Sequence, residues 1–133
     1  MCHVSAVREL RLVLTVPDFD AALGFYRDAL GLDVEAVWSS EGGHVTLLSA
    51  GRATVELVDE AHAAEIDRLE VGRRVAGPVR VAFEVEDSTA VADELEAAGA
   101  TRIAGPVLTP WNDTNVRLQA PDGTQLTLFT PAE

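Results

Sequence analysis

The sequence has few of the features that would tie it to a disulfide framework or to a membrane. Its 133 residues include a single cysteine, Cys2, which cannot form an internal disulfide. No apolar run approaches the length of a membrane span, and the opening residues MCHVSAVREL lack the apolar core of a signal peptide. We therefore expect a cytoplasmic protein without a membrane partner.

Basic side chains are also scarce. Lys and Arg together number 10 against 22 Asp and Glu, which gives a formal net charge of −12. Nucleic acids and anionic membranes are bound through clustered Lys and Arg, so this composition argues against both kinds of partner. The excess of negative charge serves either solubility or the attraction of a cationic small molecule.

Aromatic residues and catalytic motifs are rare. Phe, Trp and Tyr make up 5% of the chain, and the sequence contains no G-x-S-x-G, no H-E-x-x-H and no glycine-rich phosphate loop. Trp38 comes near the end of an expected strand and Trp111 lies in an expected loop. Large amphipathic rings at a pocket rim suit flat aromatic ligands. The alternative that Trp111 only packs its own loop stays open.

What the sequence does contain is a repeat. Residues 16–31 read VPDFDAALGFYRDALG and residues 85–99 read VEDSTAVADELEAAG. Each run follows an apolar-polar alternating stretch, places an Asp two residues after the last Val, and ends at a glycine. Alternation with period two predicts a strand, and the amphipathic run with its cap predicts a helix. The sequence therefore predicts two copies of a β-α-β-β-β unit.

The expected strands are 10–16, 32–39, 44–50, 53–59, 79–85, 101–104, 114–119 and 125–130, and the expected helices are 20–30, 60–69 and 89–98. In the first helix, Leu23, Tyr26 and Leu30 share the inner stripe, and Phe25 is expected in the core as well. Residues 70–78 are interpreted as a linker with solvated Arg73 and Arg74. We expect one domain spanning 1–133, built from modules of about 8–70 and 79–131.

This pattern resembles the vicinal oxygen chelate superfamily, which includes glyoxalases, bleomycin resistance proteins and ring-cleaving dioxygenases. The stretches that carry the resemblance are LTVPDFDAALGFYRDALGLDV near the start and PWNDTNVRLQAPDGTQLTLF near the end. The resemblance implies an α+β fold in which two tandem βαβββ modules form a curved mixed sheet around a cup, with the helices on the outside. It also implies a homodimer.

In the metal-dependent members, four ligands line the cup, one from each of four strands. The resemblance places those positions at Arg11, Glu56, Arg80 and Thr127. A guanidinium stays protonated and offers no lone pair to a metal, and threonine is a poor neutral ligand. We therefore expect no metal and no other cofactor.

The histidines do not supply a replacement metal site. His3, His44 and His62 share no spacing typical of ligands, and we expect each to face solvent or to make a single hydrogen bond.

Strand alternation places the same four residues on one face of the sheet, because each is flanked by apolar residues that point the other way. We hypothesise that Arg11 or Arg80 pairs with Glu56, since a buried carboxylate needs a partner. Such a pair either only closes the former metal site or leaves a guanidinium free to bind a carboxylate or carbonyl of a ligand. The residues expected to bind a ligand are Arg11, Trp38, Glu56, Arg80, Trp111 and Thr127.

Three functions fit these observations. The first is a metal-independent binding protein of the glyoxalase/bleomycin-resistance type that sequesters an antibiotic or an aromatic or cationic metabolite. The second is a metal-independent isomerase, lyase or cyclase that acts on a small polar metabolite in the same cup. The third is a structural module whose cup is filled by its own side chains. An open cavity with tryptophans at its rim favours the first.

Overall fold

The computed structural model describes residues 7–40 and 42–132. In this part of the chain one sheet of eight strands has the order β2-β3-β4-β1-β5-β8-β7-β6. The strands are β1 (Val7–Val16), β2 (Asp33–Ser40), β3 (Gly43–Ala50), β4 (Ala53–Asp59), β5 (Val79–Val85), β6 (Thr101–Leu108), β7 (Asp113–Gln119) and β8 (Gln125–Pro131). The predicted strand 101–104 is four residues too short, because β6 continues to Leu108.

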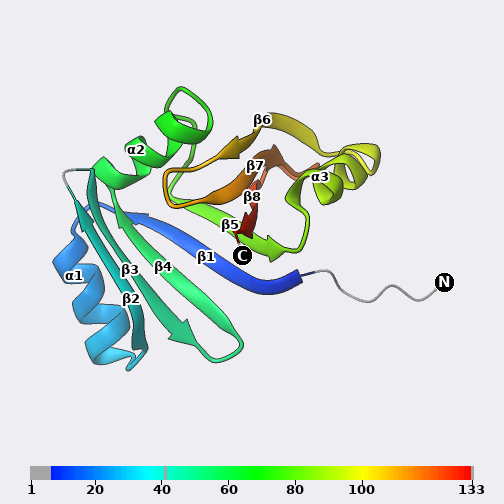
Figure 1. Cartoon of the computed structure of the whole chain (residues 1–133). Coiled ribbons are helices and arrows are strands. Elements are labelled where there is room, and N and C mark those ends of the chain that lie inside the picture. Colours follow the sequence, from blue (N-terminus) through cyan, green and yellow to red (C-terminus); the bar gives the residue numbers. More distant parts are fainter. Residues whose placement is uncertain (1–6, 41, 133) are drawn as a thin grey trace.

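The two halves of the sheet repeat one topology. In each half the first strand pairs in parallel with the last, β1 with β4 and β5 with β8, and β1 and β5 join the halves as an antiparallel pair. The sheet curves around an open space and does not close into a barrel (Figure 1). The expected α+β fold with its mixed, curved sheet is confirmed, and both halves of the cup come from one chain.

Helices α1 (Phe19–Leu23) and α3 (Ser88–Ala97) lie on the convex side of the sheet (Figure 1). Each begins after an aspartate whose side chain accepts a backbone hydrogen bond: Asp18 from the Ala21 amide at 3.0 Å, and Asp87 from the Ala90 amide at 3.1 Å. Each is the Asp that follows the last Val of the preceding strand by two residues, which the sequence marked as the start of the helix. Beneath α3, Ala92 belongs to the buried apolar cluster Val85, Ala92, Val116, Leu118 and Leu128.

The first helix departs from the predicted regular stripe. After α1 the chain continues as a π-helical segment, η1 (Gly24–Ala29), in which the Leu30 amide donates to the Phe25 carbonyl at 2.9 Å. The wider turn shifts the following side chains relative to an α-helix. Leu30 is therefore 61% exposed and Phe25 62% exposed, so the expectation that both lie in the core is wrong.

Helix α2 (Glu60–Glu70) lies on the concave side, so the expectation that the helices lie on the outside holds for α1 and α3 but is wrong for α2. Its Ala63 is part of a buried cluster with Val13, Val45, Val58, Ala82 and Phe129, all on the face of the sheet opposite the α3 cluster. Figure 1 shows α2 beside the upper ends of β3 and β4, on the side that faces β6 and β7. None of the helices described is long and apolar enough to cross a membrane.

An ion network fastens α2 to the second half of the sheet. Arg117 on β7 has a fully buried side chain and donates to Asp67 Oδ1 at 2.8 Å and to Glu70 Oε1 at 3.0 Å. The other Glu70 oxygen accepts from Asn115 Nδ2 at 2.8 Å. These bonds hold α2 against β7, and the side of α2 that faces the cavity forms one of its walls.

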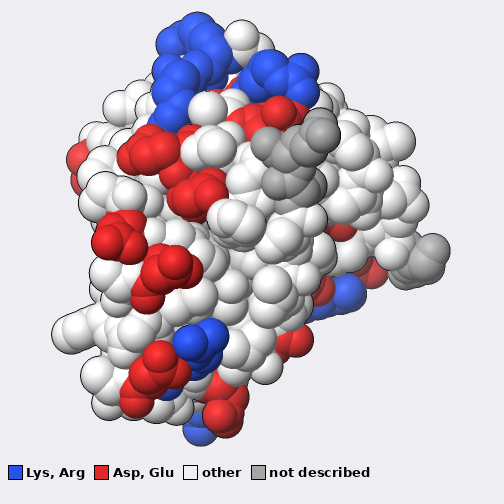
Figure 2. Space-filling model, turned by 90° about the vertical axis from the view of Figure 1, so that its left-hand side faces the viewer, with Lys and Arg blue, Asp and Glu red and all other residues white. Residues whose placement is uncertain are grey.

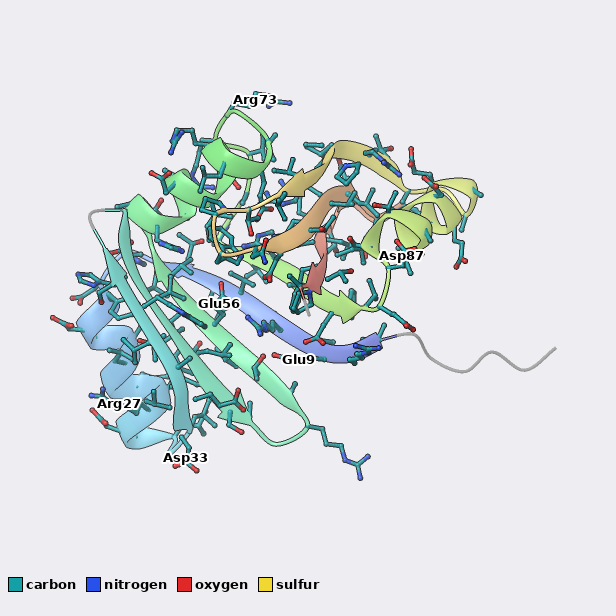
Figure 3. All side chains as sticks on the ribbon, viewed as in Figure 1. Glu9, Arg27, Asp33, Glu56, Arg73 and Asp87 are labelled. Atoms are coloured by element: carbon teal, nitrogen blue, oxygen red, sulfur yellow. The ribbon has the colours of Figure 1, made fainter. Side chains whose placement is uncertain are left out.

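Asp67 also organises the segment after α2. Its Oδ2 accepts the backbone amides of Val75 and Ala76, both at 2.7 Å, and pairs with Arg74 at 3.0 Å. Arg74 is exposed, as expected, but its ion pair with Asp67 also fastens the linker to the helix. Arg73 is exposed as well and projects away from the molecule (Figure 3).

The pKa of Asp67 reflects this network. Burial raises the pKa, but the Ala76 and Val75 amides and the Arg117 guanidinium outweigh burial and leave it below the usual value. A carboxyl group with a lowered pKa stabilises the fold above its unfolded pKa of about 3.9. This contribution disappears as the pH falls through the lowered folded value.

We predict that Arg117→Met lowers the free energy of unfolding by about 3–5 kcal/mol, because it leaves Asp67 and Glu70 buried without their cation. Urea denaturation followed by circular dichroism measures the change. Arg73→Met is the matched control and should change stability by less than about 0.5 kcal/mol, as expected for an exposed side chain. Equal stability of the two variants would contradict the role given to the network.

Candidate functional site

The concave face of the sheet encloses a cavity of about 900 Å³. Strands from both halves and helix α2 contribute to its wall. All the residues predicted to bind a ligand line it: Arg11, Trp38, Glu56, Arg80, Trp111 and Thr127. The third sequence-based possibility, a cup filled by its own side chains, does not describe this cavity.

The register of the central strands explains how four of these residues meet. Val13 on β1 pairs with Glu56 on β4 and with Arg80 on β5. Ala82 pairs with Arg11 on one side and with Thr127 on the other. Directly paired residues of adjacent strands lie on the same face of a sheet, so the four side chains share the floor of the cup. Figure 3 shows Glu56 between the two halves of the sheet.

Arg11 is held mainly by a carboxylate that the sequence analysis did not consider. Its Nε donates to Glu9 Oε2 at 2.7 Å, whereas its Nη1 lies 3.4 Å from Glu56 Oε1. Thr54 Oγ1 also donates to Glu9 at 2.7 Å, and the Arg11 guanidinium lies 4.8 Å from the centre of the Phe129 ring. The predicted pairing of an arginine with Glu56 is confirmed for Arg11, but as the weaker of its two ion pairs.

Arg80 is in a different situation. Its side chain is 7% exposed, and Nη1 donates to Thr127 Oγ1 at 2.5 Å. No carboxylate among residues 7–40 and 42–132 lies within ion-pair distance of it. Burial and the neighbouring positive charge of Arg117 lower the pKa of Arg80. The alternative pairing of Arg80 with Glu56 is therefore wrong.

His62, at the start of α2, is half-buried in the cavity wall, which corrects the expectation that it faces solvent or makes one hydrogen bond. Its Nδ1 is buried without a hydrogen-bond partner. Burial lowers the pKa of His62 and outweighs the charges of Glu56 and Asp59, so the imidazole is neutral at neutral pH.

His44 behaves as expected, since it is exposed and its Nδ1 lies 3.0 Å from Ser39 Oγ. His3 and Cys2 lie outside the described residues.

The two tryptophans lie where the cavity meets solvent. Trp38 is 49% exposed and Trp111 46% exposed, and both line the cavity. The Trp111 side chain hydrogen-bonds Asp113, yet burial dominates and raises the pKa of Asp113. Half-exposed indole rings leave apolar faces available to a flat ligand.

Acidic side chains are dispersed over the surface near the first half of the sheet. Figure 2 shows small acidic groups separated by uncharged surface on the face that carries α1, with basic side chains gathered at the top, level with α2. On this face the net charge of the chain is therefore spread out and does not form one continuous acidic patch.

The sequence profile of the Glyoxalase/Bleomycin resistance protein/Dioxygenase superfamily matches residues 8–128. The chain belongs to this superfamily. Among curated proteins no match was found.

Several solved structures share the fold. Methylmalonyl-CoA epimerase from Mycobacterium tuberculosis is 21% identical with a TM-score of 0.65, covering 100% of this chain and 94% of that chain. A variant of the Streptomyces coelicolor methylmalonyl-CoA epimerase, in complex with 2-nitronate-propionyl-CoA, is 22% identical with a TM-score of 0.69, covering 97% and 100%. A superfamily member from Vibrio splendidus 12B01 is 14% identical with a TM-score of 0.61, covering 92% and 97%. At these identities the likeness shows the fold and not the activity.

Arg11, Glu56, Arg80 and Thr127, the positions at which the family resemblance places metal ligands, line the cavity, and together they do not suit a divalent ion. Arg11 and Arg80 place two guanidinium groups where ligands would be needed, and Glu56 is in contact with Arg11. Within the described residues, no group of three or more His, Cys, Asp or Glu side chains could hold a metal ion.

Some polar residues on the concave face were not predicted from the sequence, although strand alternation could have placed them there. Glu9 precedes Arg11 by two residues on one strand, so alternation places both on one face. The same reasoning applies to Asn115 and Arg117, which alternate with buried Val116 and Leu118. No sequence pattern indicated that α2 would turn into the cup and bring its own polar side chains to the wall.

We predict that the His62 ring titrates below the ordinary histidine value of about 6.5. A proton-carbon NMR titration of the histidine resonances, with His62→Gln to assign the signal, measures this pKa. The pKa of His62 is higher in the unfolded chain, so the unfolded chain binds a proton more tightly than the folded one. The free energy of unfolding should therefore fall as the pH drops below about 6.5, and His62→Gln should reduce that loss. A His62 pKa at or above the ordinary value would contradict the burial argument.

Proposed function

We propose that this superfamily member binds a small molecule in its cup without a catalytic metal, and sequesters an antibiotic or an aromatic metabolite. The observation that carries this proposal is the open cavity of about 900 Å³, whose floor holds Arg80 at a position where the family resemblance implies a metal ligand. A cavity of this size suits a drug-sized molecule.

Electrostatics support the metal-independent part of the proposal. A divalent ion at this site would be repelled by Arg11 and Arg80, and the nearest carboxylate, Glu56, already contacts Arg11. Both guanidinium groups stay charged at any physiological pH. Binding therefore has to rely on hydrogen bonds, ion pairs and apolar contact.

The rim supports an aromatic ligand. Trp38 and Trp111 expose indole surface at the cavity, and the wall also contains apolar side chains such as Ile66 and Phe129. The homodimer and a role in antibiotic resistance stay predictions from the family resemblance, and the cytoplasmic location stays a prediction from the sequence.

A second function is favoured by one observation, the presence of His62 and Glu56 on the same cavity wall. The neutral imidazole of His62 meets one requirement of a general base, and Glu56 has an oxygen that contacts no protein group in the described part of the chain. This pair suits a metal-independent isomerase or lyase, in which a proton is removed from a bound metabolite and returned to it.

We predict that aromatic antibiotics or metabolites raise the melting temperature of the protein equally in the presence of EDTA and of added Mg²⁺, Zn²⁺ or Ni²⁺. A thermal-shift screen measures this, and ligand at a hundred times Kd should contribute about 2.7 kcal/mol. Stabilisation by a divalent ion alone that is lost in Glu56→Gln would contradict metal independence. Conversion of a stabilising compound to product, abolished in His62→Gln, would favour the enzyme.

We also predict that both indole rings report on binding. In Trp38→Phe and Trp111→Phe, each of which keeps one tryptophan, ligand should change the fluorescence of the remaining ring. Trp111→Leu should weaken binding by about 0.5–1.5 kcal/mol, the contribution expected of an aromatic contact. Phe25→Leu is the control, because Phe25 is exposed outside the cavity. Unchanged affinity in Trp111→Leu would restrict the role of Trp111 to loop packing.

A further inference from the structure

The carboxylates of the cavity wall are already partnered. Glu56 contacts Arg11, Glu65 pairs with Arg68 on the same helix, and Glu70 is divided between Arg117 and Asn115. The remaining wall carboxyl, Asp113, hydrogen-bonds the Trp111 side chain, and burial shifts it toward its neutral form. The negative charges around the cavity are thus mostly compensated from within the protein.

Arg80 forms no ion pair with a carboxylate of the described residues. The two acidic side chains that α2 brings to this half of the cup, Asp67 and Glu70, are both bound by Arg117. Arg80 keeps only the neutral hydroxyl of Thr127. Its other guanidinium nitrogens have no protein partner in the described chain and are not closed off from the cavity.

Arg80 feels the charges of Glu70, Glu56 and Asp67 only at a distance, without a direct ion pair. A buried charge without such a pair is costly, and a planar guanidinium can bind a carboxylate through two parallel hydrogen bonds. A ligand carboxylate that reached Arg80 would therefore supply what the protein does not. A ligand cation would meet the Arg80 and Arg11 charges at the floor and carboxylates already engaged elsewhere.

We propose that Arg80 is the anchor for a carboxylate of the ligand, and that the cup selects aromatic carboxylic acids over their amides and amines. This inference rests on the proposed function and adds the ligand class and the residue that recognises it. It replaces the cationic ligand suggested by the net charge of −12. Dispersed surface charges are screened beyond a Debye length of about 8 Å, whereas Arg80 would touch the ligand.

The test compares three indoles of similar shape: indole-3-acetate, indole-3-acetamide and tryptamine, which are anionic, neutral and cationic. Isothermal titration calorimetry measures each affinity for the wild-type chain. We expect the acetate to bind about tenfold or more tighter than the acetamide, as for a charge-assisted hydrogen bond, and tryptamine to bind most weakly.

Substitutions test whether Arg80 causes the preference for the acetate over the acetamide. Arg80→Met should bring the acetate and acetamide to nearly equal affinity, Arg80→Lys should keep part of the preference, and exposed Arg52→Met should leave it unchanged. Circular dichroism establishes that each variant is folded. The wild-type comparison alone tests the inference if Arg80→Met does not fold.

The inference is overturned if wild-type protein binds the acetamide or tryptamine as tightly as the acetate, if folded Arg80→Met keeps the preference, or if the acetate does not bind at millimolar concentration. The proposed function is judged separately by the thermal-shift screen. A stabilising neutral or cationic compound in that screen would preserve small-molecule binding while removing the carboxylate site.

Discussion

The interaction on which the cup depends is the buried ion pairing between Arg117 and the two acidic residues of α2, Asp67 and Glu70. A fully buried guanidinium requires nearby negative charge, and these two carboxylates provide it. These ion pairs hold α2 against the concave side of the sheet, where His62 becomes part of the cavity wall. The shape of the cavity and the identity of its polar groups thus follow from one network.

The same network sets the charge of the floor. Arg80 and Arg117 are neighbours whose positive charges interact, but only one of them receives the carboxylates of α2. In the other half of the sheet, Glu9 takes the larger share of Arg11 and leaves Glu56 with a longer contact. As a result, most carboxylates of the cavity are in ion pairs, whereas Arg80 at its floor is not. This distribution differs from the negative net charge of the whole chain.

The fold of the superfamily brings the four side chains of the floor together in this chain. Four adjacent central strands still present four side chains to one point, as the topology requires. Two of these side chains are guanidinium groups, which donate hydrogen bonds and cannot coordinate a metal. The likeness to methylmalonyl-CoA epimerases extends to the fold.

Alternation in the sequence predicts where most of the strands lie and that Arg11, Glu56, Arg80 and Thr127 share one face. The aspartates that follow the first strand of each half mark the starts of α1 and α3. These features are local, since alternation and capping involve residues only a few positions apart. Packing between distant segments, by contrast, places α2 in the cup and selects which carboxylate meets which guanidinium, and the π-helical turn of η1 leaves Phe25 and Leu30 exposed. Ion pairing between residues about fifty positions apart, such as Arg117 and Asp67, depends on where a helix comes to rest against the sheet. Packing sets that position, and no local pattern encodes it.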